Sequence, residues 1–168
     1  NWYAPSLTSS VEAGSAAWPI DEIVQLLTTG VAPQATTSGP MGEVVGHSLQ
    51  HLTTEDARAM AVYLKSLPET KPRAQPNAPV ITAQVRDWLE QGAKIYKKHC
   101  EDCHGALGQG APGIYPHLAG NRGVMLTPPV NAVRIVLNGG YPPSTSGNLR
   151  PYGMPPFAQV LNDGEVAL

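Results

Sequence analysis

Apolar side chains recur at intervals of three and four residues in several stretches of this chain, the spacing that gathers them on one face of an α-helix. In the first stretch, Ile20, Val24 and Leu27 share such a face. Helices are predicted over residues 19–29, 53–67, 82–98 and 131–138, and a last one begins near residue 162. The pattern therefore predicts short helices separated by long loops.

The residues that flank the predicted helices carry start and stop signals. Pro19 suits a first helical position, and Gly30 suits the position after the last turn. Thr53 can cap the second helix, which Pro68 ends. No helix is expected between residues 30 and 48, an irregular segment rich in Gly, Pro and Thr. The third helix should bury the stripe formed by Val85, Trp88, Leu89, Gly92, Ile95 and Tyr96.

Prolines concentrate between the second and third predicted helices. Residues 69–80 contain three prolines among charged and small residues, a composition typical of a stiff, extended linker. We therefore expect a domain boundary there, with one unit over residues 1–68 and a second unit over residues 81–168.

Two parts of the chain resemble each other at an offset of about one small domain. Residues 21–30 align with residues 131–140, and Met41 falls where Met154 lies in the second copy. If this repeat is real, residues 1–68 are the C-terminal half of a domain whose first half precedes this chain, and the second copy is cut inside its last helix. Chance similarity between short amphipathic segments is the alternative.

Composition adds one constraint to this organisation. Gly and Pro number 17 each, charged residues make up 14%, and the formal net charge is −2, so nothing favours nucleic acid as a partner. Phenylalanine occurs once, so the apolar core is small and is more plausible if a prosthetic group fills part of it. No apolar run is long enough to span a bilayer, so membrane association is expected only through further segments or partners.

The two cysteines lie in the sequence Cys100-Glu101-Asp102-Cys103-His104. This C-x-x-C-H spacing is the pattern of covalent c-type haem attachment, in which each thiol adds to a vinyl group and the histidine binds the iron. A redox dithiol would favour a βαβ setting, and structural zinc needs further ligands. A lone disulfide fits the cysteines but gives no reason for the adjoining histidine. Haem attachment with His104 as an axial ligand is therefore predicted.

A second axial ligand is expected downstream, in residues 152–157 (YGMPPF). Met154 lies there in a loop stiffened by prolines and not on a helical stripe, which favours a ligand over a core side chain. Ligation by a methionine and a histidine raises the reduction potential and leaves no open iron position, as suits an electron carrier. By the repeat, Met41 is a possible ligand of a second haem, and packing on the core is its alternative role.

Several stretches, taken in order, resemble the cytochrome c subunits of membrane-bound bacterial dehydrogenases, the multi-haem partners of alcohol, gluconate and sorbitol dehydrogenases. They are HSLQHLTTEDARAMAVYLKSLP (47–68), GAKIYKKHCEDCHGALGQG (92–110), YPHLAGN (115–121), VLNGG (136–140) and YGMPPF (152–157). The resemblance implies an all-α, class I cytochrome c-like fold for residues 81–168. Together with the internal repeat, it makes residues 1–68 the C-terminal half of a second such domain. It also implies an electron-transfer protein and not an enzyme.

The same resemblance implies roles for further residues. The Pro116 carbonyl should accept a hydrogen bond from the second ring nitrogen of His104, and Leu118 should pack on the haem. Gly92 and Tyr96 should lie where the first and last helices of the domain cross.

Other polar residues are given lesser roles. The histidines expected at the surface or behind the ligands are His47, His51, His99 and His117. Arg122 and Arg150 either pair with a haem propionate or are solvated charges. A separate hypothesis places the helix over residues 53–67 against the Gly92/Tyr96 face, where a last helix belongs.

The expected function is electron transfer by one covalently bound haem c. Electrons would pass from a quinoprotein or flavoprotein dehydrogenase subunit toward ubiquinone, another cytochrome or a terminal oxidase. Covalent haem attachment places the protein at the periplasmic face of the inner membrane. A second haem is expected only if a segment outside this chain supplies it. Two alternatives stay open: a free-standing soluble cytochrome c shuttle, and a haem enzyme or gas sensor with a labile sixth ligand.

Overall fold

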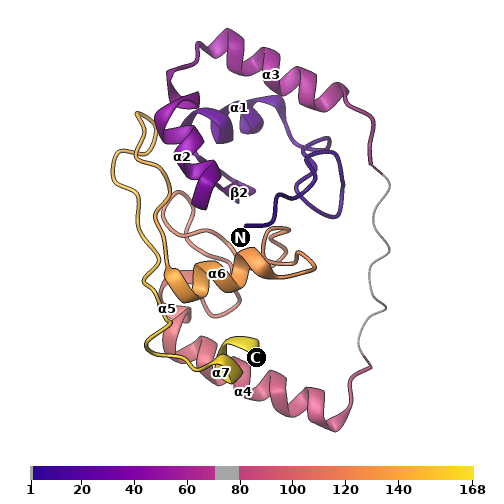
Figure 1. The fold of residues 1–168 in the computed structure, drawn as a ribbon, viewed down its shortest axis with the longest axis vertical. Helices are drawn as coiled ribbons and strands as arrows, with labels where there is room; N and C mark the ends of the chain where they lie inside the picture. The colour runs from indigo at the N-terminus through magenta and orange to yellow at the C-terminus, as the bar shows by residue number, and fades with distance from the viewer. Residues whose placement is uncertain (1, 71–79) are drawn as a thin grey trace.

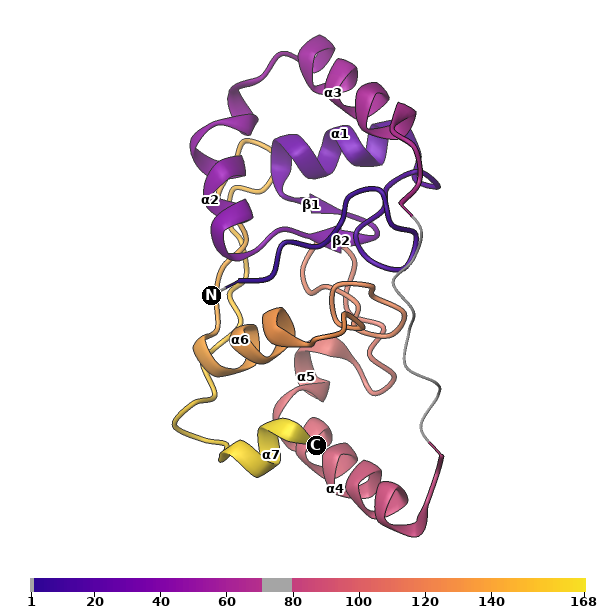
Figure 2. The ribbon, with the colours of Figure 1, turned by 45° about the vertical axis from the view of Figure 1, so that its right-hand side comes forward.

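The computed structural model describes residues 2–70 and 80–168, so most of the predicted linker lies outside the described residues. Figures 1 and 2 show an elongated molecule with one helical part at each end. The helices are α1 (Ile20–Thr29), α2 (Gly39–His47), α3 (Thr54–Ser66), α4 (Ala83–His99), α5 (Glu101–His104), α6 (Val130–Asn138) and α7 (Asp163–Ala167), and η1 (Leu49–His51) is a 3-10 helix. Strands β1 (Val31–Ala32) and β2 (Ala35–Thr36) pair as an antiparallel hairpin.

The N-terminal part is built on α1 and α3, which pack against each other (Figure 1). Trp18, Ile23 and Ala61 form its buried cluster. Partly buried side chains surround the cluster, namely Ile20, Val24, Leu26, Leu27, Ala35 and Leu64. The apolar face that the sequence predicts for the first helix is therefore the face that α1 buries.

The predicted ends of these two helices are confirmed to within one residue. α1 ends at Gly30, whose φ of 78° suits glycine and whose N–H donates to the Leu26 carbonyl at 3.0 Å. The Thr53 hydroxyl accepts a hydrogen bond from the Asp56 N–H at 3.1 Å and so caps α3.

The prediction of an irregular segment over residues 30–48 is wrong. The chain forms the β1–β2 hairpin there and then α2, which has a proline in its first turn and buries Gly42 and Val45. Glycines inside α2 lower its intrinsic helix propensity, so packing against the rest of the N-terminal part is what stabilises this helix. A propensity argument on the sequence cannot supply that packing.

In the C-terminal part, the predicted bounds of α4 and α6 are confirmed to within one residue. The prediction that α4 buries its apolar stripe is wrong for its first half, because Trp88 and Leu89 are 48% and 57% exposed. The pattern identifies the apolar face but not what covers it. Further along α4, a Cβ added at Gly92 would meet the Leu168 carbonyl oxygen at 2.8 Å, so the chain end that follows α7 packs on this helix.

α3 and α4 lie at opposite ends of the molecule (Figures 1 and 2). The hypothesis that the helix over residues 53–67 docks on the Gly92/Tyr96 face is therefore wrong. α3 buries Ala57 and Ala61 in the N-terminal part, where α1 is its neighbour, and Gly92 is already occupied by the segment after α7.

α6 joins the two parts of the molecule. The Asn131 side chain accepts a hydrogen bond from the Tyr3 N–H at 2.9 Å and donates one to the Tyr3 carbonyl at 2.8 Å. Three residues along α6, the Arg134 guanidinium lies over the Trp2 ring, 5.1 Å from its centroid. The N-terminal segment is thus fastened to the helix that precedes the Met154 loop.

Candidate functional site

The C-x-x-C-H segment begins where α4 ends. Cys100 leaves the helical conformation with φ −124°, and the short helix α5 then carries Cys103 and His104. Both thiols are free, with Cys100 partly buried and Cys103 exposed. The two cysteines therefore do not form the disulfide that was the alternative to haem attachment. Within residues 2–70 and 80–168 there is also no cluster of three or more His, Cys, Asp or Glu side chains that would bind a metal on its own.

The His104 ring is buried, and its Nδ1 lies 2.9 Å from the Pro116 carbonyl oxygen. A carbonyl oxygen only accepts hydrogen bonds, so Nδ1 must carry the proton. The lone pair of neutral His104 is therefore on Nε2, the nitrogen that remains free to bind a metal. This is the hydrogen bond that the family resemblance implies.

The loop after His104 is folded back on itself by backbone hydrogen bonds. The Gly110 N–H donates to the His104 carbonyl, and the Leu118 N–H donates to the Gly108 carbonyl, each at 2.7 Å. At Gly110, where φ is 67°, a Cβ would come within 2.5 Å of the Tyr115 carbonyl oxygen. The absence of a side chain at Gly110 thus allows the close approach that brings the Pro116 segment to His104. Leu118 is partly buried in the same loop.

The Met154 loop is held against the end of α6. Met154 and Gly140 exchange two backbone hydrogen bonds, of 2.8 Å and 3.0 Å, in an isolated antiparallel bridge. A Cβ at Gly139, where φ is 65°, would collide with the Met154 carbonyl oxygen. These two glycines therefore fix the backbone of Met154, whose side chain is partly buried.

Met41 lies elsewhere, in the first turn of α2 in the N-terminal part, and its side chain is 44% exposed. The alignment with Met154 predicts a loop at Met41, but the structure places Met41 in a helix. The structure does not bring Met41 together with the C-x-x-C-H segment.

Burial raises the pKa of the Cys100 thiol, and the neighbouring Cys103 raises it further. Cys100 is therefore a neutral thiol at pH 7. Burial also raises the pKa of Tyr96, with smaller contributions from Cys100 and Glu101. The Tyr96 hydroxyl donates to the Gly105 carbonyl at 2.6 Å and so ties α4 to the turn after His104.

Three aromatic side chains for which the sequence predicted no role lie beside these groups. The Tyr115 ring is 6.5 Å from the His104 ring and 5.5 Å from the Tyr152 ring, measured between centroids. The neighbouring Cys103 raises the pKa of Tyr115. Phe157 meets the His99 ring edge-on at 5.8 Å. In the sequence, what could have indicated a role for these aromatic residues is that Tyr115 precedes Pro116 and that Tyr152 and Phe157 lie close to Met154.

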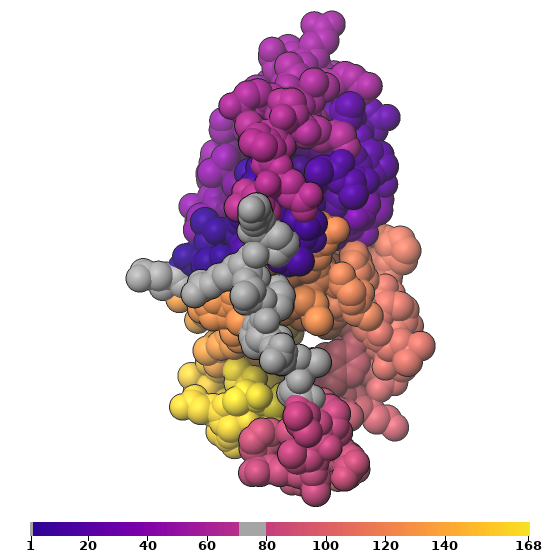
Figure 3. Space-filling view, turned by 90° about the vertical axis from the view of Figure 1, so that its right-hand side faces the viewer, coloured from indigo at the N-terminus to yellow at the C-terminus, as the bar shows by residue number. Residues whose placement is uncertain are grey.

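The donor set and its surroundings fit a covalently bound haem. Two free thiols, an imidazole with Nε2 available and a thioether come from segments that pack on one another. No side chain of α4 or α6 is buried among the described residues, although both helices are amphipathic. Figure 3 shows the surface hollowed between the pink segment of α4 and α5 and the orange segment of α6. A large apolar ring system suits such a space.

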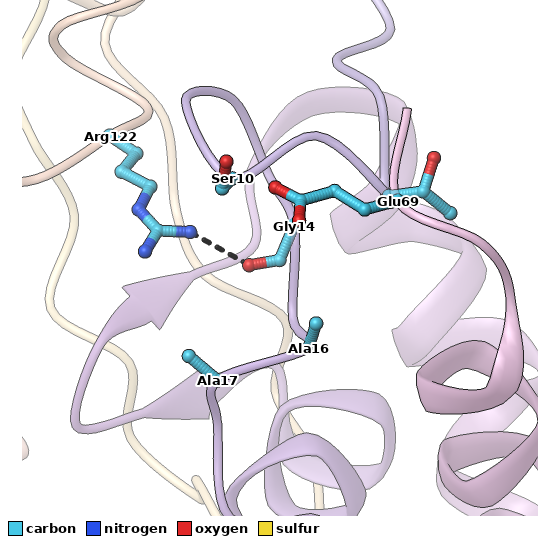
Figure 4. A pocket seen from close by; sticks show the side chains of 7 residues that line it. Ser10, Gly14, Ala16, Ala17, Glu69 and Arg122 are labelled. Carbon is cyan, nitrogen blue, oxygen red and sulfur yellow. Dashed lines mark hydrogen bonds between the residues drawn. The ribbon is translucent and has the colours of Figure 1, made fainter. Parts of the chain in front are cut away.

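The remaining candidates lie farther out. Arg122 is partly buried and donates to the Gly14 carbonyl at 2.8 Å, which joins its loop to the N-terminal segment (Figure 4). Arg150 is exposed. Two of the four other histidines, His47 and His51, are exposed, and His99 and His117 are partly buried. Over the described ranges, none of the helices has the length and apolar character needed to cross a bilayer.

Comparison with known proteins gives a consistent assignment. Residues 88–168 match the family described as cytochrome C oxidase, cbb3-type, subunit III. Across 99% of its length the chain is 36% identical to the cytochrome c subunit of alcohol dehydrogenase (quinone) from Gluconobacter oxydans (strain 621H) and covers 36% of that subunit. It is 33% identical to the gluconate 2-dehydrogenase cytochrome c subunit of Pantoea cypripedii and covers 39% of it.

A third relative, the fructose dehydrogenase cytochrome subunit of Gluconobacter japonicus, is 30% identical, and the chain covers 38% of it. The chain thus spans less than two fifths of the length of each of these three relatives. The similarity extends through both parts of the molecule, because it covers 99% of this chain in every case. Residues 88–168 therefore match a family of cytochrome subunits, and along nearly its whole length the chain is similar to cytochrome c subunits of dehydrogenases.

Proposed function

We propose that this chain transfers electrons through one haem c that Cys100 and Cys103 bind covalently. The observation that carries the proposal is the buried His104 ring, whose Nδ1 lies 2.9 Å from the Pro116 carbonyl and whose Nε2 is therefore free for iron. When bound, the haem supplies an iron that changes its charge by one electron. The protein contributes the attachment, the axial ligands and a rigid apolar surround.

Each residue has one task in this proposal. The two thiols would form the thioether bonds, and His104 and Met154 would bind the iron. Pro116 fixes the tautomer and the orientation of the His104 ring, and Leu118 packs on the haem. If His104 and Met154 both bound the iron, no iron position would be left for a substrate, and the chain would carry electrons without being the enzyme itself.

We further propose that the donor is the catalytic subunit of a quinoprotein or flavoprotein dehydrogenase. The acceptor would be a quinone or another cytochrome, at the periplasmic face of the inner membrane. The names of the similar proteins support this assignment, since they are cytochrome subunits of alcohol, gluconate and fructose dehydrogenases.

For the architecture, we propose a class I cytochrome c fold over residues 81–168 and the C-terminal half of a second such domain over residues 1–68. The position of two helices supports the repeat, because the aligned residues 21–30 and 131–140 contain most of α1 and α6, respectively. In this proposal Met41 is the ligand of a second haem that another segment attaches. Its exposed side chain is accessible to such a group.

Production of the chain together with haem-attachment machinery tests the proposal. The intact mass should exceed the polypeptide mass by one haem, and the Cys100→Ala/Cys103→Ala variant should lose that addition. Met154→Ala should abolish the methionine–iron charge-transfer band and allow the reduced protein to bind carbon monoxide. Met125→Ala, in an exposed loop position, should leave the band unchanged. A chain that acquires no covalent haem, or a band that survives in Met154→Ala, would overturn the assignment.

A further inference from the structure

The Met154 loop is tied to the His104 loop by one pair of tyrosines. The rings of Tyr115 and Tyr152 meet edge to face, with centroids 5.5 Å apart and an interplanar angle of 66°. Tyr115 directly precedes Pro116, whose carbonyl lies 2.9 Å from the His104 ring nitrogen. Tyr152 lies two residues before Met154. The pair therefore joins the two segments that would hold the iron from opposite sides.

Tyr115 contacts more than its tyrosine partner. Its ring centroid is 6.5 Å from that of His104, at a tilt of 58°. The backbone of Tyr115 is itself fixed, since it exchanges hydrogen bonds of 2.8 Å and 2.9 Å with Ala111. A ring on a fixed backbone, touching both ligand-bearing segments, is suited to set the distance between them.

The other parts of the Met154 loop are held by other elements. Gly140 pairs with the Met154 backbone, and a Cβ at Gly153 would collide with the Tyr141 ring. Phe157 packs on His99, beside the first cysteine. Tyr152 is the residue at the start of the loop that fastens it to the His104 side, and its side chain is still 55% exposed.

We propose that Tyr115 and Tyr152 are positioning residues whose edge-to-face contact holds the Met154 sulfur on the haem iron. This inference rests on the proposed function. A thioether is a neutral, weak ligand, so its occupancy depends on the effective concentration that the loop gives it. Releasing one end of the loop lowers that concentration and favours competing ligands.

The ring and not the hydroxyl is the part that matters. The two tyrosines meet with the edge of one ring against the face of the other, and such pairs contribute about 0.5–1.5 kcal/mol beyond burial. Phenylalanine preserves the ring at either position, whereas leucine removes it at similar volume. Tyr63 on α3 is a matched control, because it is 64% exposed and has no ring contact within the described part of the chain.

The experiment uses the haem-loaded chain and titrates the oxidised protein with imidazole, following the methionine–iron charge-transfer band. Tyr115→Leu and Tyr152→Leu should each lower the imidazole concentration at half-loss of the band by about three- to tenfold, because 1.4 kcal/mol corresponds to tenfold. The double variant should change it by no more than either single variant, as expected when both remove one contact. Tyr115→Phe, Tyr152→Phe and Tyr63→Leu should behave as the unmodified chain.

Leucine variants that bind imidazole as weakly as the unmodified chain, or two single effects that simply add in the double variant, would overturn the inference. If one leucine variant does not attach haem, the other leucine variant decides the question, because each of them removes the same ring contact. Failure of the proposed function gives a different result, because the unmodified chain would then show no covalent haem or no methionine–iron band.

Discussion

Two glycines in the loop after His104 share a backbone conformation but not their surroundings. Gly110 has φ 67° and Gly113 has φ 73°, a region that side-chain-bearing residues rarely adopt. A Cβ at Gly110 would lie 2.5 Å from the Tyr115 carbonyl oxygen and 2.7 Å from the backbone of Pro116, whereas a Cβ at Gly113 would meet nothing within 4 Å. Substituting alanine at each position therefore separates two costs in folding free energy: the positive φ, which both glycines share, and the steric clash, which only Gly110 has.

Gly113→Ala should lower the free energy of unfolding by about 1–2 kcal/mol, the cost of a left-handed conformation for alanine. Gly110→Ala should cost about 1–3 kcal/mol more, because the new Cβ also displaces the segment that bonds His104. Denaturant unfolding of both variants measures the difference. Equal losses at the two positions would mean that the close approach at Gly110 does not matter.

At the scale of elements, α3 is stabilised by its cap and by the face that it buries. The Thr53 hydroxyl accepts from the Asp56 N–H at 3.1 Å, while Thr54 is the first helical residue and is exposed. The ion pair between Arg58 and Asp21 also links α3 to α1 at 2.7 Å, but both side chains are largely exposed. An exposed pair of this kind contributes little, so the cap and the buried face of α3 should matter more to its stability than the ion pair does.

Thr53→Ala should therefore lower the free energy of unfolding by about 1 kcal/mol, with fraying of the first turn of α3. Thr54→Ala, one residue later, removes no capping bond and should change stability by less than about 0.5 kcal/mol. Thermal unfolding followed by circular dichroism measures both. The cap assignment fails if the two substitutions have the same effect.

At the scale of the whole molecule, α6 fastens the N-terminal segment to the C-terminal part. Its Asn131 side chain both accepts from and donates to the Tyr3 backbone, at 2.9 Å and 2.8 Å. Asn138, at the end of the same helix, donates to the Arg134 carbonyl at 3.0 Å, a hydrogen bond that lies within α6. The two asparagines thus differ in whether they reach across the interface.

Asn131→Ala should speed amide hydrogen exchange over residues 2–18 by about five- to a hundredfold, since it removes two hydrogen bonds, each worth about 0.5–1.5 kcal/mol. Asn138→Ala should leave exchange in that segment unchanged. Mass spectrometry of peptides after timed exchange gives the comparison. If Asn131→Ala has no effect on residues 2–18, other contacts hold the N-terminal segment in place.

The sequence predicted most helices because their boundaries are encoded locally. Caps and stops such as Thr53 and Gly30, and an apolar period of three to four residues, act within one element. It failed for α2, whose glycines give no helical signal, and for the first half of α4, where Trp88 and Leu89 stay 48% and 57% exposed. In both cases the deciding factor is what packs against the element, which local pattern does not contain.

For the candidate site, the attachment motif, His104 and Met154 were predicted from residue type and spacing, and their roles as ligands stay predictions for the experiments above. Met41 as a second ligand likewise stays a prediction. The Tyr115–Tyr152 contact was not predicted, because nothing local relates two residues in loops so far apart along the chain.

By itself, the sequence determined which chemistry the chain can support: two thiols and an imidazole at a fixed spacing, a methionine in a stiff loop, and helices with marked ends. Only the tertiary structure decided the tautomer of His104, the partners of α3 and α4, and the side chains that hold the Met154 loop. The physical reason is range. Spacing and capping act over a few residues, whereas burial and hydrogen bonds between loops depend on segments that only folding brings together.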